Sequence, residues 1–180
     1  MSREPCIRPV ALAIARRGQA LLVFEGRDSH DGREFYRPLG GGIEFGEHSE
    51  HAVRRELREE LGAELRDAHL LGVLEEVFTF RGEPRHELLF VYEVSFDDPA
   101  WYDRASVDFD DDGDPLRAVW VKPQQDGRPL YPEGLLGLLP RAARGPRCSS
   151  TGFAGSGLPR SYPTSAPGCK TSAQPGGWRR

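Results

Sequence analysis

The first 140 residues of this chain predict a mixed α/β domain. Short apolar or β-branched runs, separated by turn-forming residues, are typical of the strands of a sheet. One stretch rich in Glu, Arg, Leu and Ala, residues 49–61, has helical periodicity and ends before Gly62. Beyond Pro140 the composition changes abruptly, so we expect the folded domain to end there.

The expected strands follow from the apolar runs and the turns between them. Residues 16–19 and 81–84 predict hairpin turns. Arg37 precedes a proline, which disfavours helical angles and predicts an extended piece. We expect strands over residues 10–15, 20–24, 73–80, 87–96 and 116–121, an extended piece over 34–39, a loop with three glycines over 40–42, an acidic loop over 108–114 and a short closing helix over 133–139.

The charge of the chain is uneven. Its net charge is −4, but seven of its 24 basic residues and none of its 28 acidic ones follow Pro140, so the first 140 residues carry a balance of −11. An acidic body argues against a stable nucleic-acid complex, which needs a basic face. It suits a protein that binds divalent cations.

The last 40 residues differ from the rest. Glycine, proline and serine account for 18 of them, and no apolar periodicity is present. Such a segment cannot bury enough surface to offset its ordering entropy, so we expect residues 141–180 to be disordered. The abrupt change also fits a shift of reading frame, and the sequence leaves this alternative open.

No address is visible in the sequence. The N-terminus lacks the basic-then-apolar pattern of a secretory signal, and no apolar run is long enough to cross a bilayer. Cys6, Cys148 and Cys169 are odd in number and have no metal-site spacing, which favours free thiols in a reducing compartment. We therefore expect a cytoplasmic protein without membrane contact.

The helix over residues 49–61 gathers carboxylates on one edge. At about 100° per residue, Glu56, Glu59 and Glu60 fall within an arc of roughly 100°, beside an apolar stripe. Three such carboxylates, with Glu47 arriving from the preceding loop, repel one another unless cations neutralise them. Oxygen-only ligands favour Mg²⁺ or Mn²⁺ over zinc. The alternative interpretation is a surface helix whose glutamates face water.

Residues 41–63, GGIEFGEHSEHAVRRELREELGA, resemble the Nudix box. The box reads G-x5-E-x7-R-E-U-x-E-E-x-G-U, where U is a bulky apolar residue. Gly41, Glu47, Arg55, Glu56, Leu57, Glu59, Glu60 and Gly62 match their positions, and Ala63 departs from the last, which is a packing position. Seven fixed residues match by chance at about one start in 10⁹, far less often than a lone glycine motif.

The resemblance implies both a fold and a reaction. It implies an α/β/α sandwich with a central mixed β-sheet over residues 5–140. It also implies a hydrolase in which water attacks one phosphorus of a diphosphate in a nucleoside diphosphate linked to a further group X. A nucleotide-binding or regulatory module of the same fold, without activity, is the alternative. Such modules generally lose box glutamates, whereas this chain keeps them.

The same resemblance assigns roles to individual residues. The metal ligands are expected to be Glu56, Glu59 and Glu60, with Glu47 and the carbonyl of Gly40. Arg55 is expected to orient a glutamate by a charge-assisted hydrogen bond, or else to form a surface ion pair with Glu59. The general base is expected to be a box glutamate, Glu59 or Glu60, or a residue elsewhere, for which Glu87 is the candidate. For substrate binding we expect Arg37, Gly41 and Gly42, the glycines through backbone N–H groups.

The box names the reaction but not X. Nucleoside triphosphates and nucleotide sugars both remain open as substrates. Phe78, Phe80 or Trp120 could stack on a base, although packing in the core is the favoured interpretation. The expected partner is a small nucleotide-like molecule, and a homodimer is compatible with the sequence.

Overall fold

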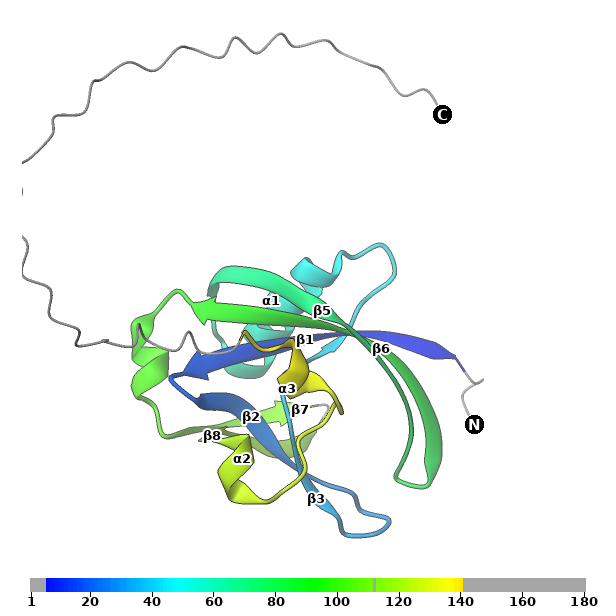
Figure 1. The fold of residues 1–180 in the computed structure, drawn as a ribbon. Helices are drawn as coiled ribbons and strands as arrows, with labels where there is room; N and C mark the ends of the chain where they lie inside the picture. The colour runs from blue at the N-terminus through cyan, green and yellow to red at the C-terminus, as the bar shows by residue number, and fades with distance from the viewer. Residues whose placement is uncertain (1–5, 112, 141–180) are drawn as a thin grey trace, which may run out of the picture. The chain divides into compact units, whose positions relative to one another are not determined.

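The computed structural model describes residues 6–111 and 113–140. Within them, eight strands form one sheet in the order β5-β6-β1-β2-β8-β7, with β4 beside β1 and β3 beside β2 (Figure 1). The strands are β1 (Ile7–Arg17), β2 (Ala20–Arg27), β3 (Glu34–Arg37), β4 (Leu39–Gly42), β5 (Leu65–Phe80), β6 (Glu83–Phe96), β7 (Ser106–Asp111) and β8 (Asp114–Val121). The helices are α1 (Ser49–Leu61), α2 (Pro123–Asp126) and α3 (Leu135–Leu138), with a 3-10 turn, η1 (Pro99–Asp103).

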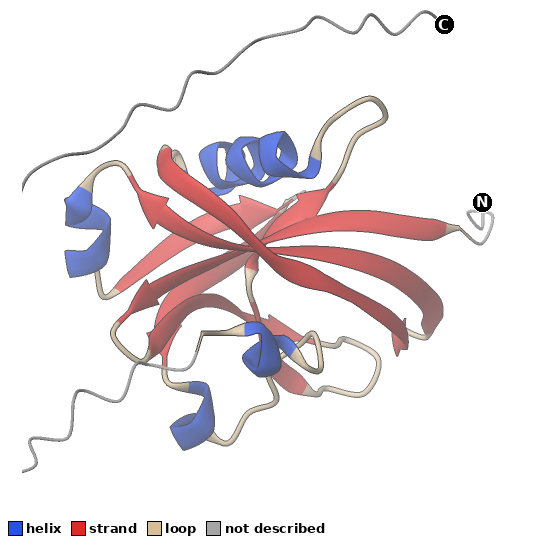
Figure 2. Cartoon of the chain, turned by 45° about the horizontal axis from the view of Figure 1, so that its top comes forward, coloured by secondary structure: helices blue, strands red, loops and turns tan. Residues whose placement is uncertain are grey.

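Strand β1 organises the sheet because it has three partners. It pairs parallel to β6 over nine positions, antiparallel to β4 from Val10 to Ala13, and antiparallel to β2 at its end. Figure 2 shows α1 on one side of the sheet and the shorter helices α2 and α3 on the other. This arrangement confirms the predicted fold class, a mixed sheet between helices.

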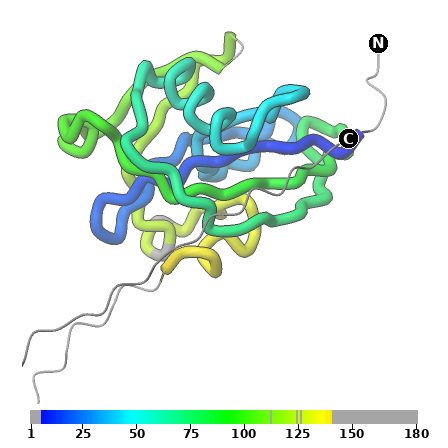
Figure 3. The backbone as a smooth tube through the Cα atoms, turned by 90° about the horizontal axis from the view of Figure 1, so that it is seen from above, coloured from blue at the N-terminus to red at the C-terminus, as the bar shows by residue number. Residues whose placement is uncertain are grey.

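Alternation along β1 feeds two separate cores. Ala11, Ala13 and Ala15 face α1 and pack in one cluster with its buried residues Ala52, Val53 and Leu57. Ile14 faces the other side and packs in a second cluster with Leu21, Val23 and Leu135 of α3. Because successive side chains of a strand point to opposite faces, a single strand supports both layers. Figure 3 shows α1 running beside β1.

Helix α1 has the bounds that the sequence predicts. Its buried residues, Ala52, Val53 and Leu57, lie on one face. Gly62 ends it in the left-handed conformation (φ 66°), and its N–H donates to the carbonyl of Arg58 at 2.9 Å. The N–H of Ala63 donates to the carbonyl of Leu57, which completes a C-terminal cap.

Two loops expected from the sequence are strands instead. The glycines 40–42 belong to β4. Glycine has a low strand propensity, but the backbone pairing with β1 makes these residues a strand. Residues 108–111 belong to β7 and Asp114 begins β8, and these strands pair from Ser106–Val119 to Asp111–Asp114, so the prediction of an acidic loop over 108–114 was wrong for these residues. Cross-strand pairing outside the local sequence explains both differences.

Other elements are present with changed bounds. Strands β5 and β6 begin at Leu65 and Glu83, earlier than expected, and their two-residue turn, Arg81 and Gly82, has positive φ at both positions, as a tight hairpin requires. The hairpin between β1 and β2 is present. The short closing helix is α3, whereas η1 and α2 were not expected. The expected disordered tail, residues 141–180, lies outside the described residues. Within the described part of the chain, no helix is long and apolar enough to span a membrane.

Gly62→Ala should lower the free energy of unfolding by about 1 kcal/mol, because alanine disfavours the left-handed conformation. A Cβ at this position would meet nothing within 4 Å, so the loss reports backbone conformation alone. Urea denaturation measures it. Gly137→Ala is the matched control, since a Cβ there also meets open space without a positive φ. Equal losses in the two variants would contradict this explanation of the cap.

Candidate functional site: a carboxylate pocket beside helix α1

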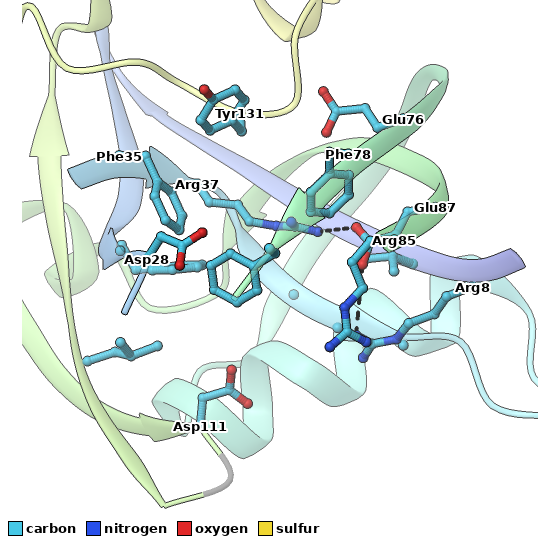
Figure 4. A pocket seen from close by; sticks show the side chains of 18 of the residues that line it. Arg8, Asp28, Phe35, Arg37, Glu76, Phe78, Arg85, Glu87, Asp111 and Tyr131 are labelled. Carbon is cyan, nitrogen blue, oxygen red and sulfur yellow. Dashed lines mark hydrogen bonds and ion pairs between the residues drawn. The ribbon is translucent and has the colours of Figure 1, made fainter. Parts of the chain in front are cut away.

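A cavity of about 1240 Å³ opens beside α1. Its walls come from the start of β1, the glycines of β4, the carboxylate edge of α1, and the two hairpins β5–β6 and β7–β8. Figure 4 shows that its residues segregate: Asp111 lies at one end, Glu76 and Tyr131 lie at the other, and Arg37 lies between.

Glu56, Glu59 and Glu60 all line this pocket. Glu60 accepts a hydrogen bond from the N–H of Gly40 at 3.3 Å. Burial, followed by the charges of Glu56 and Asp111, raises the pKa of Glu60 to about 8. Burial also raises the pKa of Glu56, against the opposing effect of Arg55. At the edge of α1, burial and mutual repulsion therefore favour the binding of a proton or a cation by these carboxylates.

The missing side chains of β4 make room for these carboxylates. A Cβ built on Gly41 would lie 2.5 Å from the carboxylate carbon of Glu56. Gly40 has φ 123°, and a Cβ there would lie 2.1 Å from the carbonyl oxygen of Ala11 in β1. Glycine at both positions lets β4 pair with β1 while α1 approaches from the side.

Arg55 ties the box residues together. Its Nε and one terminal nitrogen donate to the two oxygens of Glu47, both at 3.0 Å. The other terminal nitrogen donates to Glu56 at 2.8 Å and to Glu59 at 3.0 Å. A further bond of 2.9 Å reaches the carbonyl of Gly42. One planar guanidinium thus orients two of the α1 carboxylates against β4 and the loop that follows it.

Glu47 is held by this guanidinium. Its carboxylate also accepts the N–H of Glu44 at 3.1 Å, and the bonds from Arg55 lower the pKa of Glu47. Within residues 6–111 and 113–140, no three acidic, histidine or cysteine side chains are arranged to share one ion. In this arrangement Glu47, Glu56 and Glu59 are the partners of Arg55.

Asp111 is a site residue that sequence reasoning missed. It lies at the end of β7, lines the pocket, and raises the pKa of both Glu56 and Glu60 by its charge. Asp110 and Asp114 of the same hairpin line the pocket too. The acidic run in the sequence was visible, but its position beside α1 depends on the path of β7 and β8.

Glu87 and Arg37 form a buried ion pair in the wall of the pocket. Glu87 is 5% exposed, and one of its oxygens accepts from Arg37 at 2.7 Å. Arg8 lies 4.0 Å from its other oxygen, at the paired position of β1. Glu87 is the fifth residue of β6 rather than the first residue of a strand, as the sequence suggested, but it does face the site (Figure 4).

The favoured prediction that Phe78 and Phe80 pack in the core was wrong. Phe78 and Phe80 line the pocket instead of joining a core cluster of the described residues. Phe35 packs edge-to-face against Phe80 and Tyr131, with ring centroids 6.1 and 5.9 Å apart. Trp120 does pack against the core, and Arg17 covers its ring at 4.7 Å.

A family model described as the NUDIX domain matches residues 7–133. The chain belongs to the Nudix family. The match includes the box, every strand and α1. Ala63, where the box usually has a larger apolar residue, is fully buried in the core of this Nudix domain, as a packing position should be.

Solved structures resemble this Nudix domain at low sequence identity. The Escherichia coli ORF135 protein is 23% identical, with a TM-score of 0.53 over 74% of this chain and 87% of that protein. A MutT NUDIX hydrolase from Burkholderia pseudomallei is 24% identical, with a TM-score of 0.52 over 74% of this chain and 96% of that one. At such identities the likeness shows a shared fold. Among curated proteins, none matches the chain.

Arg55→Lys should weaken the binding of an added divalent cation by about tenfold or more, because an ammonium group cannot bridge Glu47, Glu56 and Glu59 in one plane. Isothermal titration calorimetry measures the affinity. Arg58→Lys is the control on the same helix, since Arg58 is exposed and pairs with Glu64. Unchanged affinity in Arg55→Lys would show that the network does not position the site.

Glu60 gives a pH prediction for protein freed of divalent ions. Because its pKa is raised from 4.5 to about 8, its contribution to stability is complete below about pH 4.5 and is lost as the pH rises through about 8. In EDTA, the Tm of the wild type should fall over this range by more than that of Glu60→Gln. Glu64→Gln, at an exposed position, should behave as the wild type does. Parallel curves for the wild type and Glu60→Gln would refute the prediction.

Proposed function

We propose that this chain is a Mg²⁺- or Mn²⁺-dependent hydrolase that cleaves the diphosphate linkage of a nucleoside diphosphate-X substrate by attack of water on phosphorus. The observation that carries the proposal is the crowding of Glu56, Glu59 and Glu60 with Asp111 in one pocket. The complete set of box glutamates supports an enzyme over a silent binding module. The cavity, about 1240 Å³ in volume, is large enough for a nucleotide-sized molecule.

The donor chemistry of the residues present fits a hard divalent ion, although no three of the described acidic side chains are arranged to share one ion in this structure. Their donors are carboxylate oxygens, burial and mutual repulsion disfavour their charge, and the space beside Gly41 is already filled by the carboxylate of Glu56. Glu56, Glu59 and Glu60 would hold the ions, with the carbonyl of Gly40. Glu47 would contribute mainly through Arg55, because both of its oxygens accept from that side chain. When bound, the ions offset charge on the phosphates and lower the pKa of the attacking water.

The chain itself supplies positioning and a proton acceptor. Glu60 is fixed by the N–H of Gly40, and Glu59 extends furthest toward solvent among the three helix carboxylates. Either can take the proton of the attacking water. Glu87, the candidate outside the box, is committed to Arg37 by a bond of 2.7 Å, which favours a positioning role.

Arg37 is the proposed phosphate-binding residue of the pocket wall. Its side chain is 20% exposed, and Glu87 holds its guanidinium in place. A guanidinium held by a buried carboxylate loses little entropy when it binds a second anion. The backbone of Gly41 and Gly42, which lines the pocket, would contribute to the same phosphate path.

Glu59→Gln and Glu60→Gln should each lower kcat by about 10²–10⁴-fold while the fold persists, because a ligand or the general base is lost. A panel of nucleoside triphosphates, dinucleoside polyphosphates and nucleotide sugars provides the measurement, with formation of the nucleoside monophosphate and of pyrophosphate or phosphorylated X followed directly. EDTA should abolish the activity, and added Mg²⁺ should restore it.

Glu50→Gln is the matched control for these variants. Glu50 lies on the same helix but pairs with Arg54 at its exposed start and does not line the pocket. Near-wild-type turnover in Glu59→Gln or Glu60→Gln would remove the site assignment. Nucleotide binding without turnover of any substrate in the panel would favour the silent module.

A further inference from the structure

We propose that the end of the pocket opposite Asp111 binds a nucleobase that carries an exocyclic amino group, with Phe78 stacking on the base and Glu76 accepting a hydrogen bond from the amino group. The inference rests on the proposed function and deepens it, because it names the class of nucleotide that the site prefers. Glu76 and Phe78 both belong to β5 and both line the pocket.

Phe78 is an aromatic side chain that the packing of the core does not account for. Within the described residues, it joins none of the core clusters and makes no ring contact with another aromatic or cationic side chain. Phe80, by contrast, packs on Phe35 and under Arg81. A half-buried ring that lines a pocket without a partner is suited to stack on a planar ligand.

Glu76 offers an acceptor beside this ring. One of its oxygens accepts the N–H of Glu133, and no other hydrogen bond or ion pair to its carboxylate is found among the described residues. Figure 4 places Glu76 at the end of the pocket away from Asp111, the end at which Tyr131 also lies. The second oxygen of Glu76 is therefore available to a ligand.

The spacing of the two residues matches the size of a base. Alternate residues of a strand point to one face and lie about 6.5–7 Å apart. A base stacked on Phe78 can thus extend its edge toward Glu76, two positions earlier in β5. An ionised carboxylate only accepts hydrogen bonds, so it favours the amino group of cytosine or adenine over the carbonyl oxygen of uracil or hypoxanthine.

The rest of the pocket gives the ligand a direction. Arg37 lies between this end and Asp111 (Figure 4), so a nucleotide with its base on Phe78 would lead its phosphates past Arg37 toward the carboxylates of α1. The charge order of the pocket therefore agrees with a base at one end and a diphosphate at the other.

The test compares nucleotides in which an amino group beside an unprotonated ring nitrogen is replaced by a carbonyl beside a ring N–H, CTP against UTP and ATP against ITP, at pH 8 with Mg²⁺. For the wild type we expect kcat/KM to favour CTP and ATP by about tenfold or more, because the carbonyl analogue leaves a carboxylate facing an oxygen. Equilibrium binding of the same four nucleotides, measured by calorimetry, should show the same preference.

Glu76→Gln separates recognition from folding. Its amide oxygen can still accept the N–H of Glu133, while its NH₂ group can donate to a carbonyl, so the preference should shrink at least fivefold or invert. Phe78→Ala should raise KM about tenfold for both members of each pair and leave their ratio unchanged. Asp67→Asn and Leu70→Ala, exposed positions of β5 that do not line the pocket, are the matched controls and should leave both quantities as in the wild type.

The outcomes distinguish the inference from the function on which it rests. Hydrolysis of both members of each pair at equal rates, with Glu76→Gln without effect on the ratio, would overturn the base assignment and keep the hydrolase. An amino preference in binding that Glu76→Gln removes, without turnover, would support the base site and count against the hydrolase. Absence of both binding and turnover for all four nucleotides would overturn the assignment of this end to a base.

Discussion

The repulsion among carboxylates at the edge of α1 is the constraint on which the site depends. Glu56 and Glu60 are partly withdrawn from water, the charge of Asp111 raises the pKa of both, and the charge of Glu56 raises the pKa of Glu60 further. The fold offsets this cost from two sides, through the guanidinium of Arg55 and the N–H of Gly40. The repulsion that these two groups do not offset favours the binding of an additional positive charge.

Strand β4 connects that constraint to the fold. Its glycines pair with β1 on one side and meet α1 on the other, and a side chain at Gly40 or Gly41 would collide with β1 or with Glu56. Glycine at these two positions is therefore required both for the pairing of β4 with β1 and for the close approach of Glu56. Arg55 reinforces the same junction, because it binds the carbonyl of Gly42 as well as the glutamates.

The parts of the site that the sequence predicts are those encoded within one stretch of chain. The periodicity of residues 49–61 and Gly62 predicts α1, and the box spacing brings Arg55 beside Glu47 and Glu59. Asp111 could not be predicted, because its place beside α1 results from the pairing of β7 with β8. Three consecutive glycines likewise suggest a loop until β1 is known to lie beside them. Phe78 was misassigned to the core because its run of alternating residues does not reveal which face of β5 is covered.

The division of the pocket between a helix and a hairpin has a consequence for how substrates are distinguished. The carboxylates lie on α1, where a change of one position rotates a side chain by about 100° and removes it from the cluster. Residues that face the opposite end come from β5, where alternate side chains share one face and each can change without displacing its neighbour. The proposed chemistry thus depends on the geometry of α1, whereas the proposed selectivity can vary along β5. For that reason the proposed choice of nucleotide should be tested at Glu76 and Phe78 rather than in the box.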